Sequence, residues 1–336
     1  MTYFVTGGTG FIGRHLINQL LQREGTIYVL VRPGSVDKLE TLKAEFWNGD
    51  TDRIVAIEGD LTKSLLGVSE DDRQQLRGKV QHFFHLAAIY DLGAGASEQE
   101  ETNINGTRHA VRLADDLQAG CFHHTSSIAA AGLYSGIFRE DMFEEAEGLD
   151  NPYFRTKHEA EGVVRRDCKV PWRVYRPGIV VGHSETGEID KIDGPYYFFK
   201  LIQKMRRLLP PWMPTVGIEG GRINLVPVDF VVRAMDHIAH QDDLNGQCFH
   251  LTDPKPKRIG EILNLFAQAG HAPQMSMRVD ARLFNFIPGV VKQGLGMLPP
   301  VRRLSTHFLR EFGIPREVLK LVNYPTRFDA RETERA

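Results

Sequence analysis

The chain has 336 residues, a formal net charge of −2 and 25% charged residues. This length is enough for a doubly wound domain of about 200 to 250 residues together with a smaller second unit. The balanced charge gives no sign of a nucleic-acid partner or an acidic surface, so small molecules are the expected ligands. No apolar run approaches the roughly 18 residues that cross a bilayer, and since only Met1 and Thr2 precede the first strand pattern, we expect no signal peptide.

The three cysteines, Cys121, Cys168 and Cys248, are odd in number and far apart in the sequence. Because secreted domains use paired cysteines, we expect reduced thiols and a cytoplasmic protein that is at most peripheral to a membrane. The thirteen histidines raise the question of a metal site. His237 and His240 share a helical face, but no further ligands with zinc spacing accompany them, so we expect no metal.

The stretch YFVTGGTGFIGRHL, residues 3–16, predicts a strand, a tight turn and a helix. Gly7 allows the sharp bend, Gly10 lets the backbone approach a ligand, and Gly13 lets the helix pack on the strand. Free N–H groups at the helix N-terminus would then meet a diphosphate. The G-x-x-G-x-x-G spacing differs from the commoner G-x-G-x-x-G, and an ordinary turn also uses glycine, but the position after a first strand favours a dinucleotide.

Strand and helix patterns alternate through the first half of the chain. Apolar, β-rich runs predict strands at 26–32, 52–60, 79–88, 121–127 and 172–178, and helical periodicity predicts helices at 35–47, 101–117 and 151–166. The alternation predicts an α/β fold, a Rossmann-type doubly wound parallel sheet with helices on both faces.

The rhythm changes after Gly182. Residues 183–221 carry glycines, prolines and an aromatic cluster, whereas 222–252 predict a strand, a helix with Asp229 as N-cap, and another strand. We therefore expect a nucleotide-binding Rossmann domain of residues 1–182 plus about 222–252. A smaller, mainly helical substrate-binding part is expected from 183–221 plus about 253–330, and 331–336 are expected to begin a linker.

The sequence LDNPYFRTKHEAEGVVRR predicts a helix that Asn151 caps and Pro152 begins. Tyr153 and Lys157 lie four residues apart, on one helical face. A tyrosine has an ordinary pKa of about 10 and needs a nearby cation to exchange a proton near neutral pH, which Lys157 can supply. Ser127 ends a predicted strand, at the sheet edge where ligands bind, and can orient a substrate oxygen. These three are the candidate catalytic residues for hydride transfer to a carbonyl, with Tyr153 as general acid and base.

Six motifs in order carry a family resemblance: TGGTGFIG (6–13), HLAA (85–88), TNINGT (102–107), SSIAAAG (126–132), YFRTK (153–157) and RPGIVVG (176–182). In register they resemble the extended short-chain dehydrogenase/reductase superfamily. Residues 176–200 and the C-terminal half look like the bacterial alcohol-forming fatty acyl-CoA reductases, close to thioester reductase domains. The resemblance covers essentially the whole chain.

The resemblance implies NADPH-dependent reduction of a fatty acyl thioester (acyl-CoA), of the derived fatty aldehyde, or of both, toward the fatty alcohol. In the bacterial enzymes that the chain resembles, such a domain is followed by a second reductase domain, and the two steps could be divided between them. The expected partners are a long-chain acyl-CoA or fatty aldehyde and that second domain. Peripheral membrane contact and a homo-oligomer stay open.

The resemblance also implies which residues hold the cofactor. Those expected at the dinucleotide are Gly7, Thr9, Gly10, Phe11, Ile12, Gly13, Arg32, Asp60, Leu61, Ala87, Ala88, Asn105, Tyr153, Lys157, Pro177, Gly178 and Ile179. Among them Arg32 ends the second strand, and no acid follows before Asp37. An arginine there suits the 2′-phosphate of NADPH, whereas an NAD enzyme carries an acid; an ordinary exposed arginine is the alternative.

Two other function classes stay open, a nucleotide-sugar epimerase or dehydratase and a non-enzymatic NADP-binding sensor. A sensor usually lacks the tyrosine and lysine. Sugar-active relatives usually carry an aromatic residue where this chain has Ala131, and the segment after Gly182 offers rings such as Tyr196, Phe198 and Phe199 rather than a polar pocket. The rings favour an alkyl chain, with packing in the core as the alternative.

Overall fold

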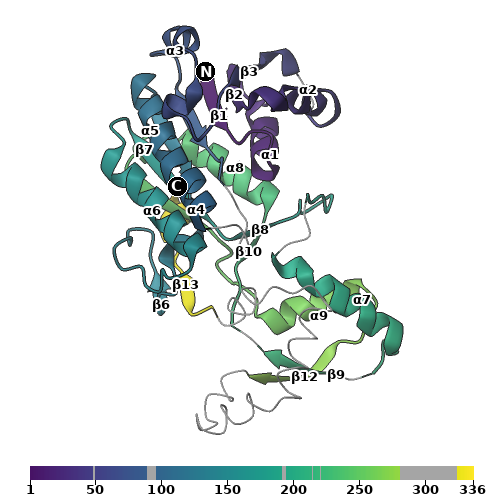
Figure 1. The fold of residues 1–336 in the computed structure, drawn as a ribbon. Helices are drawn as coiled ribbons and strands as arrows, with labels where there is room; N and C mark the ends of the chain where they lie inside the picture. Colours follow the sequence, from purple (N-terminus) through teal and green to yellow (C-terminus); the bar gives the residue numbers. More distant parts are fainter. Residues whose placement is uncertain (48–49, 89–95, 191–193, 214, 220, 281–323) are drawn as a thin grey trace. The chain divides into compact units, whose positions relative to one another are not determined.

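The structure is a computed structural model that describes residues 1–336 except 48–49, 89–95, 191–193, 214, 220 and 281–323 (Figure 1). The chain forms two compact units. Unit 1 comprises Met1–Ile189, Leu225–Pro254 and Thr326–Ala336, and unit 2 comprises Asp190–Asn224 and Lys255–Pro325.

Seven parallel strands form the centre of unit 1, in the order β11-β7-β5-β4-β1-β2-β3. They are β1 (Thr2–Thr6), β2 (Thr26–Val31), β3 (Ile54–Glu58), β4 (His82–His85), β5 (Cys121–Thr125), β7 (Trp172–Pro177) and β11 (Gln247–Leu251). The chain order reverses at β1, where Val5 pairs with Val29 of β2 and with Phe84 of β4. Ligands of such sheets bind beyond the carboxyl ends of the strands at this reversal.

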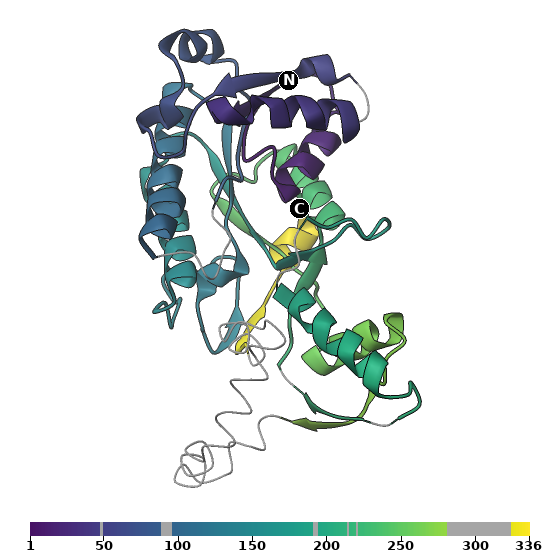
Figure 2. The same ribbon diagram turned by 45° about the vertical axis from the view of Figure 1, so that its right-hand side comes forward.

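Helices cover both faces of the sheet (Figures 1 and 2). One face carries α1 (Phe11–Leu20), α2 (Val36–Glu45) and α8 (Val228–Ala239), and the other carries α3 (Glu70–Leu76), α5 (Gly106–Asp116) and α6 (Pro152–Asp167). Side chains alternate along β1, so that Tyr3 and Val5 pack on the α1 and α8 side and Phe4 packs on the α5 and α6 side. The predicted doubly wound α/β fold is confirmed.

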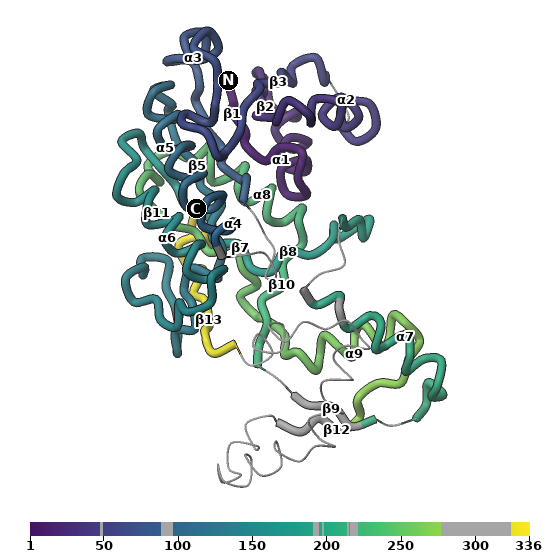
Figure 3. The backbone as a smooth tube through the Cα atoms, viewed as in Figure 1, coloured from purple at the N-terminus to yellow at the C-terminus, as the bar shows by residue number. Residues whose placement is uncertain are grey.

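Short elements complete unit 1. They are η1 (Pro33–Ser35), η2 (Thr51–Arg53), η3 (Ser64–Gly67), α4 (Ala96–Gln99), the π-helical turn η4 (Glu100–Asn105), η5 (Ile128–Ala131), β6 (Gly136–Phe138), β8 (Ile179–Val181), β10 (Leu225–Pro227), β13 (Thr326–Phe328) and α13 (Arg331–Arg335). The last residues of the chain, yellow in Figure 3, return to unit 1, and β13 pairs in parallel with β6. Residues 331–336, where we expected a linker to begin, therefore form α13 and pack within unit 1.

Unit 2 contains η6 (Gly194–Phe198), α7 (Phe199–Leu208), β9 (Thr215–Glu219), α9 (Ile259–Ala269) and β12 (Met275–Asp280). The strands β9 and β12 form a parallel pair. Ile202, Ala267 and Ala272 are buried together within this unit. In neither unit does a described helix combine the length and apolar character needed to cross a membrane.

Asp229 does not cap α8, contrary to the sequence prediction. The helix begins at Val228, directly after β10, so Asp229 lies in the first turn. Its carboxylate accepts hydrogen bonds from the backbone N and the Oγ of Ser184, both at 2.9 Å, and from Arg233 at 2.7 Å. The side chain therefore holds the loop that follows β8.

Four histidines of unit 1, His85, His123, His124 and His250, are each at most 3% exposed. Burial lowers their pKa values, to about 3 for His124 and His250 and well below the ordinary value for the other two. They are therefore neutral in the folded protein at physiological pH, whereas the unfolded chain would protonate them below a pH of about 6.5.

Unit 1 should lose stability as the pH falls below about 6.5. Each histidine contributes fully above that pH, and its contribution falls by up to about 1.4 kcal/mol per pH unit on acidification because only the unfolded state takes up the proton. The free energy of unfolding, measured in urea between pH 7.5 and 5, should decrease accordingly. His124→Leu should make this dependence shallower, and a variant slope equal to that of the wild type would contradict the assignment.

Candidate active site

The turn after β1 packs closely against neighbouring backbone at Gly7 and Gly13 but not at Gly10. Gly7 has a φ of +74°, and a Cβ there would lie 2.7 Å from the backbone N of Ala87. A Cβ on Gly13 would lie 2.1 Å from the carbonyl oxygen of Gly7, so the helix start requires glycine at that position. Among the described residues, a Cβ on Gly10 would meet only this same oxygen, at 3.3 Å. Gly10 is therefore the point at which a ligand can approach the backbone.

The N-terminus of α1 can receive an anion. Its N-cap residue, Gly10, offers no side-chain cap, and the first turn contains no acidic residue. In the described part of the chain, the amides of Phe11, Ile12 and Gly13 have no hydrogen-bond partner. Three free donors and the positive end of the helix dipole suit a diphosphate. Together with Thr9 in the same turn, these residues fit the dinucleotide that the sequence predicted.

A basic side chain, not an acidic one, follows β2. Arg32 is exposed, and no described residue forms a hydrogen bond or ion pair with its guanidinium. Asp60 accepts hydrogen bonds from the N and Oγ1 of Thr62, and these bonds, with smaller contributions from Lys63 and Arg32, lower its pKa. Leu61 lies close to the start of α5: a Cβ added to Gly106 would be 3.4 Å from the Cβ of Leu61.

A directed chain of hydrogen bonds runs beneath the site. The N–H of Ala87 donates to Thr6 Oγ1 at 3.3 Å, and His85 lies between Thr6 Oγ1 at 2.8 Å and Thr107 Oγ1 at 3.1 Å. Thr107 donates to the carbonyl oxygen of Asn103 at 2.6 Å, so its oxygen accepts from Nε2–H of His85, and Nδ1 accepts from Thr6. The neutral imidazole therefore ties the loop after β4 to the turn η4.

The two asparagines of the TNINGT motif have different surroundings. Asn103 is buried, and its Nδ2 donates to Thr156 Oγ1 of α6 at 3.4 Å. Asn105, the one expected at the cofactor, donates to Glu101 at 2.8 Å and accepts from Arg108. The sequence analysis did not select Asn103. Its four-residue spacing from Thr107 was the available signal.

The start of α6 forms as the sequence predicted. Pro152 takes the first helical position, and the Asn151 side chain accepts from the N of Tyr153 at 2.9 Å. Tyr153 and Lys157 are both 6% exposed. Burial lowers the pKa of Lys157 to about 8, and no described residue pairs with its ammonium. The helix thus holds a tyrosine and an unpaired cation one turn apart.

Ser127 lies on the loop that packs against α6. It caps η5, where its Oγ accepts from the N of Ala129 at 3.1 Å, which leaves the hydroxyl proton available to a ligand. The ring of His158 in α6 donates from Nδ1 to the carbonyl oxygen of Ala130 at 3.0 Å, and this bond joins the two segments. Ala131, next along, is fully buried and packs with Phe138.

A buried carboxylate joins the three segments that carry the candidate residues. Glu161 accepts from Arg176 at 2.6 and 2.9 Å, from Ser126 Oγ at 2.8 Å and from Arg165 at 2.8 Å. Burial alone would raise the pKa of Glu161, but the two guanidiniums hold it well below its usual range. Ser126 precedes Ser127, and Arg176 precedes the segment 177–179. The sequence analysis missed this cluster, although Glu161 follows Lys157 by one more turn.

The remaining expected residues follow the strand ends. Pro177 ends β7, Ile179 begins β8, and Gly178 between them donates its N–H to the carbonyl oxygen of Leu251 at 3.0 Å. Ala88 follows Ala87 in the loop after β4. No group of three or more metal-ligating side chains occurs among the described residues.

The aromatic residues expected to line an alkyl pocket lie in unit 2. The ring of Phe199 packs against Tyr196 with centroids 5.1 Å apart and against Phe266 at 5.0 Å. Phe199 remains 41% exposed. The rings therefore pack together within this unit and still present a surface.

Known proteins resemble this chain over most of its length. Residues 5–235 match the family described as "Male sterility protein". The chain is 30% identical over 296 residues to the nonribosomal peptide synthetase FrzA of Cladobotryum sp, a match that covers 82% of the chain and 28% of FrzA. It is 29% identical to "Aldehyde reductase lnbA" of Aspergillus flavus, over 75% of the chain and 26% of that protein. The chain thus spans less than a third of these two relatives.

A third relative and two solved structures are similar. The Drosophila melanogaster protein named "Putative fatty acyl-CoA reductase CG8306" is 27% identical, over 86% of the chain and 69% of that protein. The terminal R domain of the myxalamid PKS-NRPS pathway superposes with a TM-score of 0.75 at 26% identity, covering 99% of this chain and 84% of that one.

A UDP-glucuronic acid 4-epimerase from Bacillus cereus, solved with NAD, gives a TM-score of 0.60 at 19% identity, covering 83% of this chain and 88% of that one. This likeness shows the shared fold alone. The family match, in contrast, includes the glycine turn, the HLAA segment and α6. The chain therefore belongs to the family described as "Male sterility protein", within the NAD(P)-binding extended short-chain dehydrogenase/reductase superfamily.

Proposed function

We propose that this protein uses NADPH to reduce a fatty acyl thioester, a fatty aldehyde or both to the fatty alcohol. The observation that carries the proposal is the pair of buried side chains on α6, Tyr153 and the unpaired Lys157, on a helix packed against the Ser127 loop. The names of two relatives, an aldehyde reductase and a fatty acyl-CoA reductase, support the same substrate class.

The residues would divide the work as follows. Bound NADPH supplies the hydride that adds to the carbonyl carbon. Ser127 donates its free hydroxyl proton in a hydrogen bond to the carbonyl oxygen, and Tyr153 transfers its phenolic proton to that oxygen as negative charge develops. The Lys157 ammonium stabilises the resulting phenolate, because a nearby cation favours the charged form. With a thioester, a first reduction breaks the C–S bond and releases thiol, and a second reduces the aldehyde.

The protein is proposed to act in a larger context. The chain spans 28% of FrzA and 26% of the aldehyde reductase relative, and so corresponds to one part of each. We propose that a second reductase domain works beside this one, that the two reduction steps are divided between them, and that the setting is cytoplasmic with peripheral membrane contact.

Product analysis tests the reaction class directly. The protein is incubated with NADPH and decanoyl-CoA, with NADPH and decanal, or with a panel of nucleotide sugars. Decanol from either fatty substrate supports the proposal, and comparison of the two assigns the thioester and aldehyde steps. Conversion of a nucleotide sugar would instead support an epimerase or dehydratase. NADPH binding without turnover of any substrate would indicate a sensor.

Tyr153→Phe should reduce kcat for decanal by about a hundred- to ten-thousandfold, the usual contribution of general acid catalysis. NADPH binding, followed by fluorescence titration, should change little because the dinucleotide is held mainly by the turn after β1. Tyr28→Phe, which alters another tyrosine of unit 1 on β2, is the matched control and should retain wild-type activity. Wild-type turnover by the Tyr153 variant would overturn the mechanism.

Arg32→Ala should weaken NADPH binding by about ten- to a hundredfold, because a hydrogen bond to a charged group contributes roughly 1.5 to 3 kcal/mol. NADH binding should change little, so the preference between the two cofactors narrows. Lys38→Ala, which removes another exposed cation close in sequence, should leave the preference unchanged. If the Arg32 variant keeps the wild-type ratio of dissociation constants, a different basic residue contacts the 2′-phosphate.

Catalytic efficiency with aldehydes should rise from hexanal to dodecanal. Burial of each methylene contributes about 0.8 kcal/mol, roughly a fourfold gain per carbon until the binding surface is filled. Phe199→Ala should flatten this rise with less effect on hexanal, whereas Leu208→Ala, at the exposed end of the same helix, should not. A flat wild-type series below the solubility limits would remove the fatty-chain assignment and leave a reductase of another carbonyl substrate.

A further inference from the structure

The C-terminal segment, residues 326–336, is bound to unit 1 by specific contacts along its length. Its strand β13 pairs with β6, and the N of Asp329 donates to the carbonyl oxygen of Phe138 at 3.0 Å. Further along, Ala330 is buried, and the carbonyl oxygen of Ala336 accepts from His237 at 3.1 Å. The segment is thus packed on the unit that carries the candidate catalytic residues.

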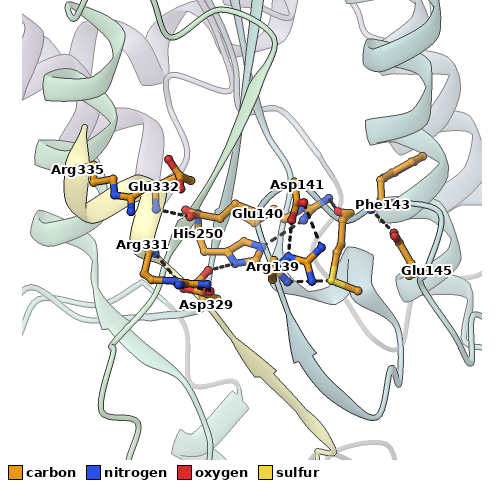
Figure 4. Close-up of polar contacts among 12 residues, drawn as sticks. Arg139, Glu140, Asp141, Phe143, Glu145, His250, Asp329, Arg331, Glu332 and Arg335 are labelled. Carbon is orange, nitrogen blue, oxygen red and sulfur yellow. Dashed lines mark hydrogen bonds and ion pairs between the residues drawn. The ribbon is translucent and has the colours of Figure 1, made fainter.

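Glu140 joins the C-terminal segment to the edge of the sheet (Figure 4). The residue is 5% exposed, and its carboxylate accepts from the backbone N of His250 on β11 at 2.8 Å. It also accepts from the N of Glu332 at 2.7 Å and from the N and Oγ1 of Thr333 in α13. One buried side chain therefore satisfies an edge-strand donor and the first amides of α13, which would otherwise be unpaired.

His250 connects the C-terminal segment to Arg176 in the interior of unit 1. Its Nδ1 lies 2.7 Å from the carbonyl oxygen of Asp329, which can only accept, so Nδ1 carries the proton. Nε2 is then the acceptor for Nη1 of Arg176 at 3.1 Å. The Phe328 ring packs edge-on against the imidazole, with centroids 5.4 Å apart. The C-terminal segment therefore fixes both the tautomer and the ring plane that Arg176 meets.

Arg176 connects His250 to the active-site segments through the buried carboxylate of Glu161 described above. Both side chains of this ion pair are fully buried, so its geometry cannot be relaxed by water. Each member of the cluster adjoins a candidate catalytic or cofactor segment: Ser126 adjoins Ser127, Arg176 adjoins Pro177, and Glu161 lies one turn beyond Lys157.

We propose that the C-terminal segment is a positioning element of the active site, acting through His250 on the Arg176–Glu161 pair. The proposal rests on the reductase function proposed above. Arg176 donates to Glu161, to the carbonyl oxygen of Met142 and to His250. Release of the segment would free His250, and the loss of this fixed acceptor would shift Arg176 and the three segments that meet at Glu161. Because misplacement of catalytic groups by about 1 Å can cost a hundredfold in rate, kcat should be sensitive to a segment that carries no catalytic group.

Glu140→Gln is the first test. An amide has one acceptor oxygen and one NH2 group, so in either orientation the NH2 group faces at least one N–H donor of α13, Glu332 N or Thr333 N, and the segment should be loosened or released. Hydrogen exchange of residues 326–336 verifies that release, and circular dichroism verifies the fold. We expect kcat for decanal to fall about tenfold or more, with KM for NADPH within about twofold. Arg335→Ala, which removes an exposed ion pair with Glu332 in the same segment, should leave kcat unchanged. A released segment with wild-type kcat would overturn the proposal.

If Glu140→Gln does not fold, Phe328→Ala serves as the second variant with the same readouts.

The path through His250 is tested by two replacements. His250→Gln can place an acceptor near the former Nε2 and should retain most of kcat, whereas His250→Asn keeps only the donor toward Asp329 and should lose it. In the double variant of His250→Asn and Glu140→Gln, the fold decrease in kcat should be smaller than the product of the fold decreases in the two single variants. Equal losses in the two replacements, or independent effects in the double variant, would overturn this path.

A readout besides activity separates this proposal from the proposed function. Hydrogen exchange is followed in peptides that contain residues 152–158 and 176–180, in the wild type and in Glu140→Gln. Faster exchange there in the variant supports the positioning role even if the wild type reduces neither decanal nor decanoyl-CoA, in which case only the proposed function fails. Unchanged exchange in both peptides while residues 326–336 are released would overturn the positioning role.

Discussion

The fully buried ion pair between Glu161 and Arg176 is the interaction on which the arrangement of the candidate active-site segments depends. Two charges removed from water are tolerated only when their remaining hydrogen-bonding capacity is satisfied, and here Ser126, Arg165 and His250 satisfy it. Loss of one partner of such a pair typically costs about 3 to 5 kcal/mol, because the other charge is left unpaired. Helix α6 and the ends of β5 and β7 are thus joined at one point that permits little displacement.

A second constraint acts at the sheet reversal, on the cofactor side. The backbone of Gly7 approaches the loop after β4 so closely that a Cβ would meet Ala87, and the hydroxyl of Thr6 accepts from the same residue. His85 extends this contact to Thr107 and the turn η4. Neutral donors and acceptors form this connection, whereas an ion pair, Glu161 with Arg176, joins α6 to the ends of β5 and β7. Among the described residues, neither connection supplies a hydrogen-bond partner for the first amides of α1 or for the ammonium of Lys157.

The sheet, the glycine turn and the position of Tyr153 and Lys157 on one face of α6 could be predicted, because each depends on local spacing: alternation along strands, three-residue steps between glycines, and four residues on a helix. The contacts that depend on the tertiary fold could not. Glu161 meets Arg176 only because β7 packs under α6. Asp229 accepts hydrogen bonds from Ser184 instead of capping α8. The docking of the C-terminal segment on Glu140 spans nearly two hundred residues, and no local pattern marks such a pairing.

Helix α6 carries two buried charges on one face, a carboxylate that is matched by cations and an ammonium that has no matching anion among the described residues. Tyr153, Lys157 and Glu161 follow one another at four-residue intervals, and all three are buried. The carboxylate is matched by two guanidiniums, which hold its pKa well below its usual range despite burial. The ammonium has no matching anion among the described residues, so burial lowers its pKa to about 8 and leaves it just able to stay charged at neutral pH. A carboxylate beside Lys157 would have neutralised that charge. Its absence leaves the ammonium unmatched one turn from Tyr153, as the mechanism proposed above requires, and the paired Glu161 fixes the same helix one turn further on.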